Sequence, residues 1–179
     1  TIVANDIGPE GGMERQLTVL IDGLLAAGHR VTVIAWSCDL PPHPNLRHLK
    51  VPGPSRPFSL GYPLFLLAAS LMVRRHGRGI VHSTGAIVLN RTDVCTVHFC
   101  HSAFAKLRSR SRASRSSIVF RLNGWVVRWI SRLAERWCYR PERAGRLVAV
   151  SGGVARELRE HFPRMRERTL MIPNGVDSE

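Results

Sequence analysis

Lysine and acidic residues are scarce in this sequence. Its 179 residues include 26 basic ones, of which only Lys50 and Lys106 are lysine, and 13 acidic ones, which leaves a formal charge of +13. Such a surplus of arginine can reflect a GC-rich genome as readily as a function. Hydrophobic residues at 44% and charged residues at 22% are ordinary proportions for a globular protein and exclude wholesale disorder.

Several functional signatures are also missing. No two of the four cysteines have CxxC spacing, which excludes a zinc ribbon or a thioredoxin-type motif, and their apolar surroundings suit reduced thiols in the cytoplasm. The longest apolar stretch, residues 60–73, is shorter than the roughly 20 residues that span a bilayer, and we expect no signal peptide. There is no GxSxG motif and no pair of carboxylates placed for acid–base hydrolysis.

Strand and helix patterns alternate along the whole sequence. Runs of β-branched residues predict strands at 1–5, 31–36, 46–51, 79–83, 93–98, 146–150 and 168–172. Helical periodicity predicts helices at 13–27, 60–75, 118–140 and 153–161, the first ended by Gly28 and the last capped by Ser151. Residues 102–117, mainly Arg and Ser, predict a loop or a poorly ordered helix. The alternation favours an α/β fold, a doubly wound, mostly parallel Rossmann-like sheet in one domain, residues 1–179.

Two glycines, Gly11 and Gly12, separate the first predicted strand from its helix. Glycines at this place let backbone N–H groups approach an anion, and the helix N-terminus adds about half a positive charge. Their spacing from Gly8 does not match GxGxxG, and the lysine of a Walker A motif is absent. A tight turn with no ligand is the alternative interpretation.

Three histidines are candidates for a site. His82 and His98 each stand at the C-terminal end of a predicted parallel strand, the edge at which open α/β sheets bind ligands, and His101 follows closely. A neutral imidazole there can hydrogen-bond a substrate hydroxyl or a leaving group, whereas a structural histidine is the alternative in each case. A metal site of His98, Cys100 and His101 is disfavoured because H-x-C-H at a strand end does not converge on one point.

Residues 106–146 hold twelve basic and two acidic residues, and therefore carry +10 of the net charge. On the helix predicted there, one face combines three arginines with a glutamate: Arg121, Arg128, Arg132 and Glu135. The opposite face is apolar and consists of Val126, Ile130, Leu133 and Trp137. Trp125 and Trp129 flank the polar face. This layout is typical of a basic helix that lies on an anionic membrane. A core helix with a solvated arginine face is the alternative. Nucleic acid is disfavoured because no helix-turn-helix, RRM or zinc-finger pattern is present.

Three motifs in order give the sequence a family resemblance. They are Gly11-Gly12-Met13-Glu14-Arg15 with Gly28-His29-Arg30-Val31-Thr32-Val33, then Ala149-Val150-Ser151 with Val154-Ala155-Arg156-Glu157-Leu158, then Ile172-Pro173-Asn174-Gly175-Val176-Asp177. Together they resemble family 4 retaining glycosyltransferases. The resemblance covers residues 1–179 and is weakest from 102 to 146.

The resemblance implies one half of a GT-B architecture, in which an N-terminal domain holds the acceptor and a C-terminal domain holds a nucleotide-diphosphate sugar, the donor. Gly11 and Gly12 match the loop beside the donor phosphates and the transferred sugar. His98 matches a catalytic-site histidine that contacts this sugar. The resemblance further implies acceptor-side residues and an interdomain hinge, which would be Glu14, Arg15, His82 and His101, and Pro173, Asn174 and Gly175. No metal or other cofactor is implied, since helix dipoles and basic side chains can neutralise the leaving phosphate.

The basic phosphate-binding residues and paired glutamates of the family's second domain have no counterpart here. We therefore expect the C-terminal donor domain to be absent from this chain, and the chain to be inactive alone, as a fragment or as half of a split enzyme. A bacterial enzyme of this kind would act on a sugar, lipid-linked or small-molecule acceptor in the cytoplasm or peripherally at the inner face of the cell membrane. The alternative is a non-catalytic Rossmann-like module that docks on an anionic membrane or a partner protein.

Overall fold

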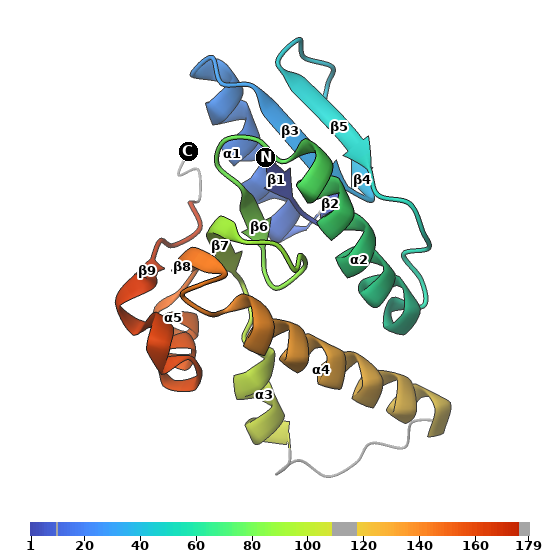
Figure 1. Cartoon of the computed structure of the whole chain (residues 1–179), viewed down its shortest axis with the longest axis vertical. Helices are drawn as coiled ribbons and strands as arrows, with labels where there is room; N and C mark the ends of the chain where they lie inside the picture. Colours follow the sequence, from blue (N-terminus) through green and yellow to red (C-terminus); the bar gives the residue numbers. More distant parts are fainter. Residues whose placement is uncertain (10, 109–117, 176–179) are drawn as a thin grey trace.

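The computed structural model describes residues 1–9, 11–108 and 118–175, and a seven-stranded parallel sheet runs through it (Figure 1). In sheet order the strands are β5 (Leu46–Lys50), β3 (Val31–Ala35), β1 (Ile2–Val3), β6 (His82–Thr84), β7 (Thr92–Val97), β8 (Ala144–Ala149) and β9 (Thr169–Met171). Every neighbouring pair is parallel. A short parallel pair, β2 (Asp6–Ile7) with β4 (Ser37–Cys38), lies beyond the ends of β1 and β3. The predicted mostly parallel, doubly wound sheet is confirmed.

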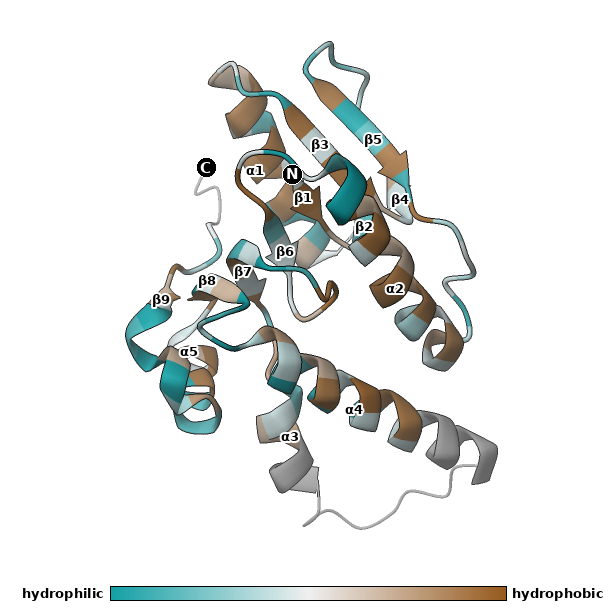
Figure 2. Ribbon diagram, viewed as in Figure 1, coloured by the Kyte–Doolittle hydropathy of each residue, from teal (hydrophilic) through white to brown (hydrophobic). Residues whose placement is uncertain are grey.

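Helices cover both faces of this sheet. They are α1 (Gly12–Ala26), α2 (Phe58–His76), α3 (His101–Arg108), α4 (Ile118–Cys138) and α5 (Gly152–His161), with a 3-10 helix, η1, at Pro163–Arg168. Helix α1 packs on one face, whereas α2, α4 and α5 share a core on the other face. In Figure 2 the hydrophobic colour concentrates on β1 and β3 and on the helices beside them.

The two cores follow from the pleat of the strands, because successive side chains point to opposite faces. Ile2 and Val33 pack toward α1 with Ile21, whereas their neighbours Val3 and Ile34 face the core that α2 enters. All five are 3% exposed or less. Burial of such a side chain contributes about 1.5–3 kcal/mol each to folding.

The strand order reverses direction between β1 and β6. From β1 the chain crosses through α1 to β3 and then β5 on one side, and after α2 it continues on the other side. Crossovers therefore leave β1 and β6 to opposite sides of the sheet. In parallel α/β sheets ligands bind outside the carboxyl ends of the strands at such a switch point.

Most predicted boundaries are confirmed within two residues, with two differences. Strand β6 begins only at His82, because Gly79 and Ile80 lie outside the sheet and the Ile80 carbonyl accepts instead from the Thr1 amino group (2.7 Å). Helix α3 occupies residues 101–108, where a loop or poor helix was expected. The rest of that prediction, residues 109–117, lies outside the described residues.

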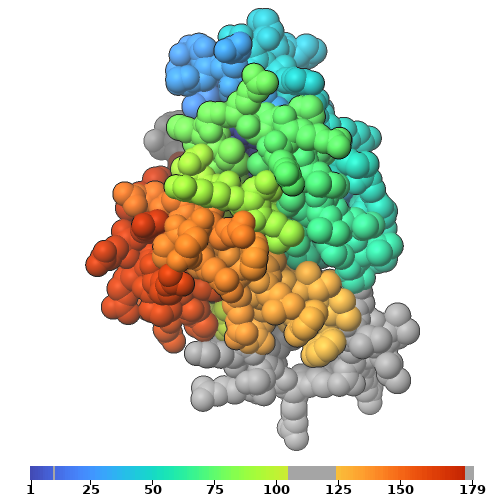
Figure 3. Space-filling view, viewed as in Figure 1, coloured from blue at the N-terminus to red at the C-terminus, as the bar shows by residue number. Residues whose placement is uncertain are grey.

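The predicted solvated arginine face of α4 is wrong. Glu135 is only 1% exposed and Arg128 and Arg132 are half-buried, whereas Trp125 is 58% and Trp129 54% exposed. The side chain of Arg121 lies outside the described part. The face with Glu135 turns inward because the carboxylate binds the start of α3. The outer face of α4 is therefore aromatic, and it lies beside α2 on the surface seen in Figure 3.

Candidate functional site

Three loops meet at the carboxyl edge of the sheet, because β1, β7 and β8 run parallel. The loop after β1 leads through β2 to Gly11 and the start of α1. Residues 98–100 connect β7 to α3, and Val150 and Ser151 connect β8 to α5. Each of the three strands is thus followed by a helix whose N-terminus points back toward this edge.

The N-terminus of α1 is open. Gly11 is its N-cap residue with φ 88° and ψ 152°, a backbone conformation that residues with a Cβ atom strongly disfavour. No side chain caps the helix. Gly12 begins the helix, and a Cβ built on it would meet nothing within 4 Å. A helix of 15 residues places about half a positive charge on the free N–H groups of its first turn.

Glu14 is the acidic residue in that first turn, and its carboxylate folds back against Gly11. Thr18 ties the loop to the helix, since its hydroxyl lies 3.3 Å from the Gly8 carbonyl and 3.1 Å from that of Glu14. Arg15 is exposed, and its backbone N–H donates to the Gly11 carbonyl (3.1 Å). The loop is thus held in place by the backbone and Thr18.

His98 follows directly after β7 and is half-buried. Burial lowers the pKa of its imidazole, and the Glu14 carboxylate acts in the opposite direction and raises it. The fold therefore brings His98 and the first turn of α1 close enough to interact electrostatically, although they are far apart in the sequence. Its Nε2 atom is buried and has no hydrogen-bond partner among the described residues.

His82 opens β6 instead of ending it, so the expectation that it stands at the carboxyl edge is wrong. Its Nε2 lies 2.8 Å from the hydroxyl of Thr96, and its backbone N–H donates to the Thr1 carbonyl (2.8 Å). Burial, then the positive charge of the Thr1 amino group, and then His98 lower the pKa of His82 to about 4. Its ring is therefore neutral and serves the packing of the sheet.

His101 begins α3, and a buried carboxylate holds it there. Glu135 accepts hydrogen bonds from the backbone N–H groups of His101 (2.7 Å) and Ser102 (2.9 Å) and from the Ser102 hydroxyl (2.6 Å). Burial raises the pKa of Glu135, and these three hydrogen bonds counteract it. Burial also lowers the pKa of His101, whose ring packs edge-on against Phe99 at 5.0 Å.

From its place on the helix Glu135 was expected on a solvated face, and this role was not predicted. A usable signal was present, because Glu135 is the only acidic residue within α4. A lone carboxylate among arginines and tryptophans is a candidate for a specific polar partner, here the N–H groups that start α3.

Ser151 caps α5 as predicted, accepting from the Val154 N–H at 3.3 Å. Gly28 likewise follows the end of α1, where its N–H donates to the Leu25 carbonyl (2.9 Å). Pro173, Asn174 and Gly175 follow β9 as exposed, irregular chain. Their role as an interdomain hinge stays a prediction.

Within the described ranges, no three His, Cys, Asp or Glu side chains are grouped so that they could hold a metal ion. No helix in these ranges has the length and hydropathy needed to cross a membrane.

A family model described as Glycosyltransferase Family 4 matches residues 10–179. The chain belongs to glycosyltransferase family 4. Among curated proteins no sequence matches this family 4 chain.

One solved structure, that of WaaG, confirms the fold. The chain is similar to WaaG, a glycosyltransferase involved in lipopolysaccharide biosynthesis, with a TM-score of 0.75 and 16% identity over 98% of this chain and 45% of WaaG. A glycosyltransferase from Rickettsia africae ESF-5 matches with a TM-score of 0.49 and 15% identity, over 98% of this chain and 42% of that one. The family 4 chain therefore has the Rossmann-like fold of one GT-B half and spans less than half the length of either protein.

Proposed function

We propose that this chain is the acceptor-binding half of a retaining glycosyltransferase that takes its sugar from a nucleotide-diphosphate donor. The observation that carries the proposal is the unpartnered Nε2 of His98 at the carboxyl edge, beside Glu14 and the open start of α1. Membership of family 4 supports glycosyl transfer as the reaction.

The start of α1 would stabilise the leaving group. As the bond from the sugar's anomeric carbon to the phosphate oxygen breaks, its electron pair goes to the diphosphate, and charge develops there. Free N–H groups at a helix N-terminus are already oriented toward such charge. The Glu14 carboxylate lies against Gly11. It would turn away as the diphosphate enters, because the carboxylate and the diphosphate are both anions and would repel each other in contact.

His98 would hold the transferred sugar. Its lowered pKa keeps the imidazole neutral at pH 7, so the ring can both donate and accept a hydrogen bond. A buried ring nitrogen without a partner costs about 1–3 kcal/mol, and a sugar hydroxyl bound to it would recover that free energy. In a single displacement, retention requires the acceptor oxygen to attack from the side on which the diphosphate leaves. Its hydroxyl proton would pass to the departing phosphate oxygen.

The acceptor would approach past Arg15 and His101, which flank the same edge. His82 is not part of this proposal, because its ring is engaged with the Thr96 hydroxyl.

The test is His98→Ala in the full-length protein that contains this chain. It is assayed with labelled nucleotide sugars and a panel of lipid and sugar acceptors. We expect turnover to fall by about 10²–10³-fold, the usual effect of removing one transition-state hydrogen bond, with a change of only a few degrees in Tm. His29→Ala, at an exposed histidine, is the matched control. Unchanged turnover in His98→Ala would refute the assignment.

Titration calorimetry of nucleotide sugars into residues 1–179 tests which half binds the donor. We expect at most millimolar binding, near −4 kcal/mol, because the base and ribose would be held by a second domain. A micromolar constant would reverse the assignment of the two halves.

Peripheral membrane binding is a second proposed function, compatible with catalysis and also with a non-catalytic module. Two apolar rows lie exposed at helical spacing: a leucine stripe on α2, formed by Leu60, Leu64, Leu67 and Leu71, and a tryptophan stripe on α4, formed by Trp125, Trp129, Leu133 and Trp137. Their side chains are 39–59% exposed. Together with the chain's charge of +13, these stripes fit insertion into an anionic lipid surface at the inner face of the cell membrane.

Sedimentation with vesicles tests this second function. We expect wild-type protein to bind vesicles of phosphatidylglycerol more than those of phosphatidylcholine, and high salt to weaken the attachment. Leu67→Asp with Trp129→Asp should abolish binding, whereas Val19→Asp, equally exposed on α1, should not. Equal, salt-independent binding to both vesicles would leave the stripes without this role.

A further inference from the structure

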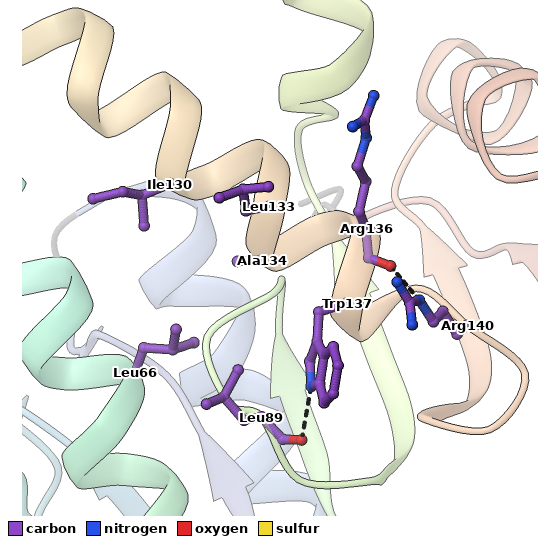
Figure 4. A pocket seen from close by; sticks show the side chains of 8 residues that line it. All are labelled: Leu66, Leu89, Ile130, Leu133, Ala134, Arg136, Trp137 and Arg140. Carbon is purple, nitrogen blue, oxygen red and sulfur yellow. Dashed lines mark hydrogen bonds between the residues drawn. The ribbon is translucent and has the colours of Figure 1, made fainter.

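A groove of about 400 Å³ lies between α2 and the second half of α4 (Figure 4). Leu66 of α2, Leu89 of the loop between β6 and β7, and Ile130 and Leu133 of α4 form its apolar walls. The size falls within the range of ordinary small-molecule pockets. The groove belongs to none of the loops at the carboxyl edge.

Trp137 forms one wall and is rigidly held. Its indole Nε1 donates to the Leu89 carbonyl (3.3 Å), and the guanidinium groups of Arg143 and Arg140 lie over its ring at 4.4 and 5.3 Å. The loop is also tied to α2, because the Leu89 N–H donates to the Ser70 hydroxyl (2.8 Å). The groove is therefore formed before any ligand arrives, which reduces the ordering cost of binding.

One end of the groove is basic. Arg136 and Arg140 line it there, and Arg143 donates to the Leu89 carbonyl at 3.1 Å. The two acidic residues nearest in sequence are both engaged elsewhere: Glu142 is in an ion pair with Arg164, and Glu135 binds the start of α3. No ion pair links any of these three arginines to a carboxylate within the described ranges.

An apolar channel that ends in arginines is complementary to an amphiphile with an anionic head. We propose that the groove binds one anionic phospholipid, with an acyl chain along the leucines and the phosphate at Arg136 and Arg140. This deepens the proposed membrane binding and rests on it, since the leucine and tryptophan stripes would bring the groove to the lipid surface. Arg143 lies where β7 begins, its carbonyl accepting from the Thr92 N–H (2.8 Å), so this lipid is an anchor at the opposite end of the sheet from His98.

Titration of monomeric dihexanoyl phosphatidylglycerol into the chain tests the groove without a membrane. We expect saturable binding of one molecule, several times tighter than that of dihexanoyl phosphatidylcholine. Leu133→Asp, which puts a carboxylate into the apolar wall, should weaken it at least tenfold. Arg140→Gln should make the two lipids bind alike. The matched controls are Leu20→Asp on α1 and Arg166→Gln on η1, both at exposed positions.

Lack of saturation, or unchanged affinity in Leu133→Asp, would overturn the proposal. If Leu133→Asp fails to fold, quenching of tryptophan fluorescence by a lipid with brominated chains, in Trp125→Phe/Trp129→Phe protein, gives the same answer: no quenching overturns it. A dimer that dissociates in Leu133→Asp would show that a second copy fills the groove instead. The two proposals fail separately: vesicle binding by wild-type protein that shows no monomer binding removes only the lipid site, and monomer binding without vesicle binding removes only the docking.

Discussion

The helix N-termini at the carboxyl edge differ in one respect. Helix α3 has its first N–H groups bound by Glu135, and α5 has one bound by Ser151. Helix α1, at the same edge, begins at Gly11 with no side-chain cap, and α2 likewise begins after Pro57 without one. A helix end normally needs such a partner or water. The capped ends of α3 and α5 thus stabilise the fold, whereas the uncapped end of α1, beside Glu14 and His98, leaves its N–H groups available to a ligand.

His82 and His98 repeat the difference between a paired and an unpaired polar group. His82 has a partner in Thr96, whereas the buried Nε2 of His98 has none among the described residues. Buried polar groups are almost always hydrogen-bonded, so the exceptions call for an explanation. Both the open helix and the unpartnered nitrogen lie around Glu14. Unpaired groups that gather at one place indicate the binding site better than either does alone.

Removing Glu135 should have the largest effect on stability. Glu135→Ala leaves two backbone N–H groups and one hydroxyl without their buried acceptor, and we expect a loss of roughly 2–4 kcal/mol in the free energy of unfolding. Urea unfolding measures it. Asp22→Ala, at an exposed residue of α1, should change stability by less than about 0.5 kcal/mol. An equally small loss in Glu135→Ala would mean that α3 needs no cap.

His82 should make the chain sensitive to acid. Its pKa of about 4 lies below the usual 6.5, so between these values the unfolded chain binds a proton that the folded chain does not. Stability from this residue is complete above pH 6.5 and is lost as the pH falls toward 4, up to about 3 kcal/mol. In His82→Gln the free energy of unfolding should depend less on pH across this range. An unchanged slope would place the titrating group elsewhere.

Removal of the Ser151 hydroxyl should have a smaller effect. Ser151→Ala deletes one hydrogen bond at the start of α5, and we expect a loss of about 1 kcal/mol. Ser151→Asp should restore it, because a carboxylate caps the same N–H group. Thermal unfolding followed by circular dichroism compares the three proteins, and equal Tm values would show that water caps α5 equally well.

The sequence predicts the sheet well because its signals are local. The structure confirms the periodic burial of side chains. It also confirms, to within a few residues, the end of α1 at Gly28, the start of α5 at Ser151 and the strand that leads to His98. The start of β6 was placed three residues early, since only pairing with the chain's first residue decides where the strand begins. No local pattern reports such a long-range contact.

The face of α4 could not be predicted for a related reason. Periodicity shows that a helix has two faces, and charge then suggests which of them meets water. Here a single buried contact, Glu135 with the start of α3, turns the charged face inward and exposes Trp125 and Trp129. The leucine stripe on α2 was readable as spacing, but its exposure depends on which neighbours the fold supplies. The candidate site could not be predicted fully for the same reason, because its residues come together only in the folded chain.

The smallest effect on stability should come from Gly12, and it gives the sharpest test of the open helix. A methyl group at Gly12 meets no atom within 4 Å, and alanine favours the helix, so Gly12→Ala should leave the free energy of unfolding unchanged or raise it by up to about 1 kcal/mol. In the full-length protein the same methyl group would stand where the donor phosphates approach the backbone, so we expect a higher KM for the nucleotide sugar and lower turnover.

Gly23→Ala, also with free space around it but in the middle of α1, is the control and should change neither KM nor turnover. Denaturant unfolding and transfer kinetics on the same samples separate the two effects. Full activity in Gly12→Ala would mean that α1 is open for a reason other than the donor.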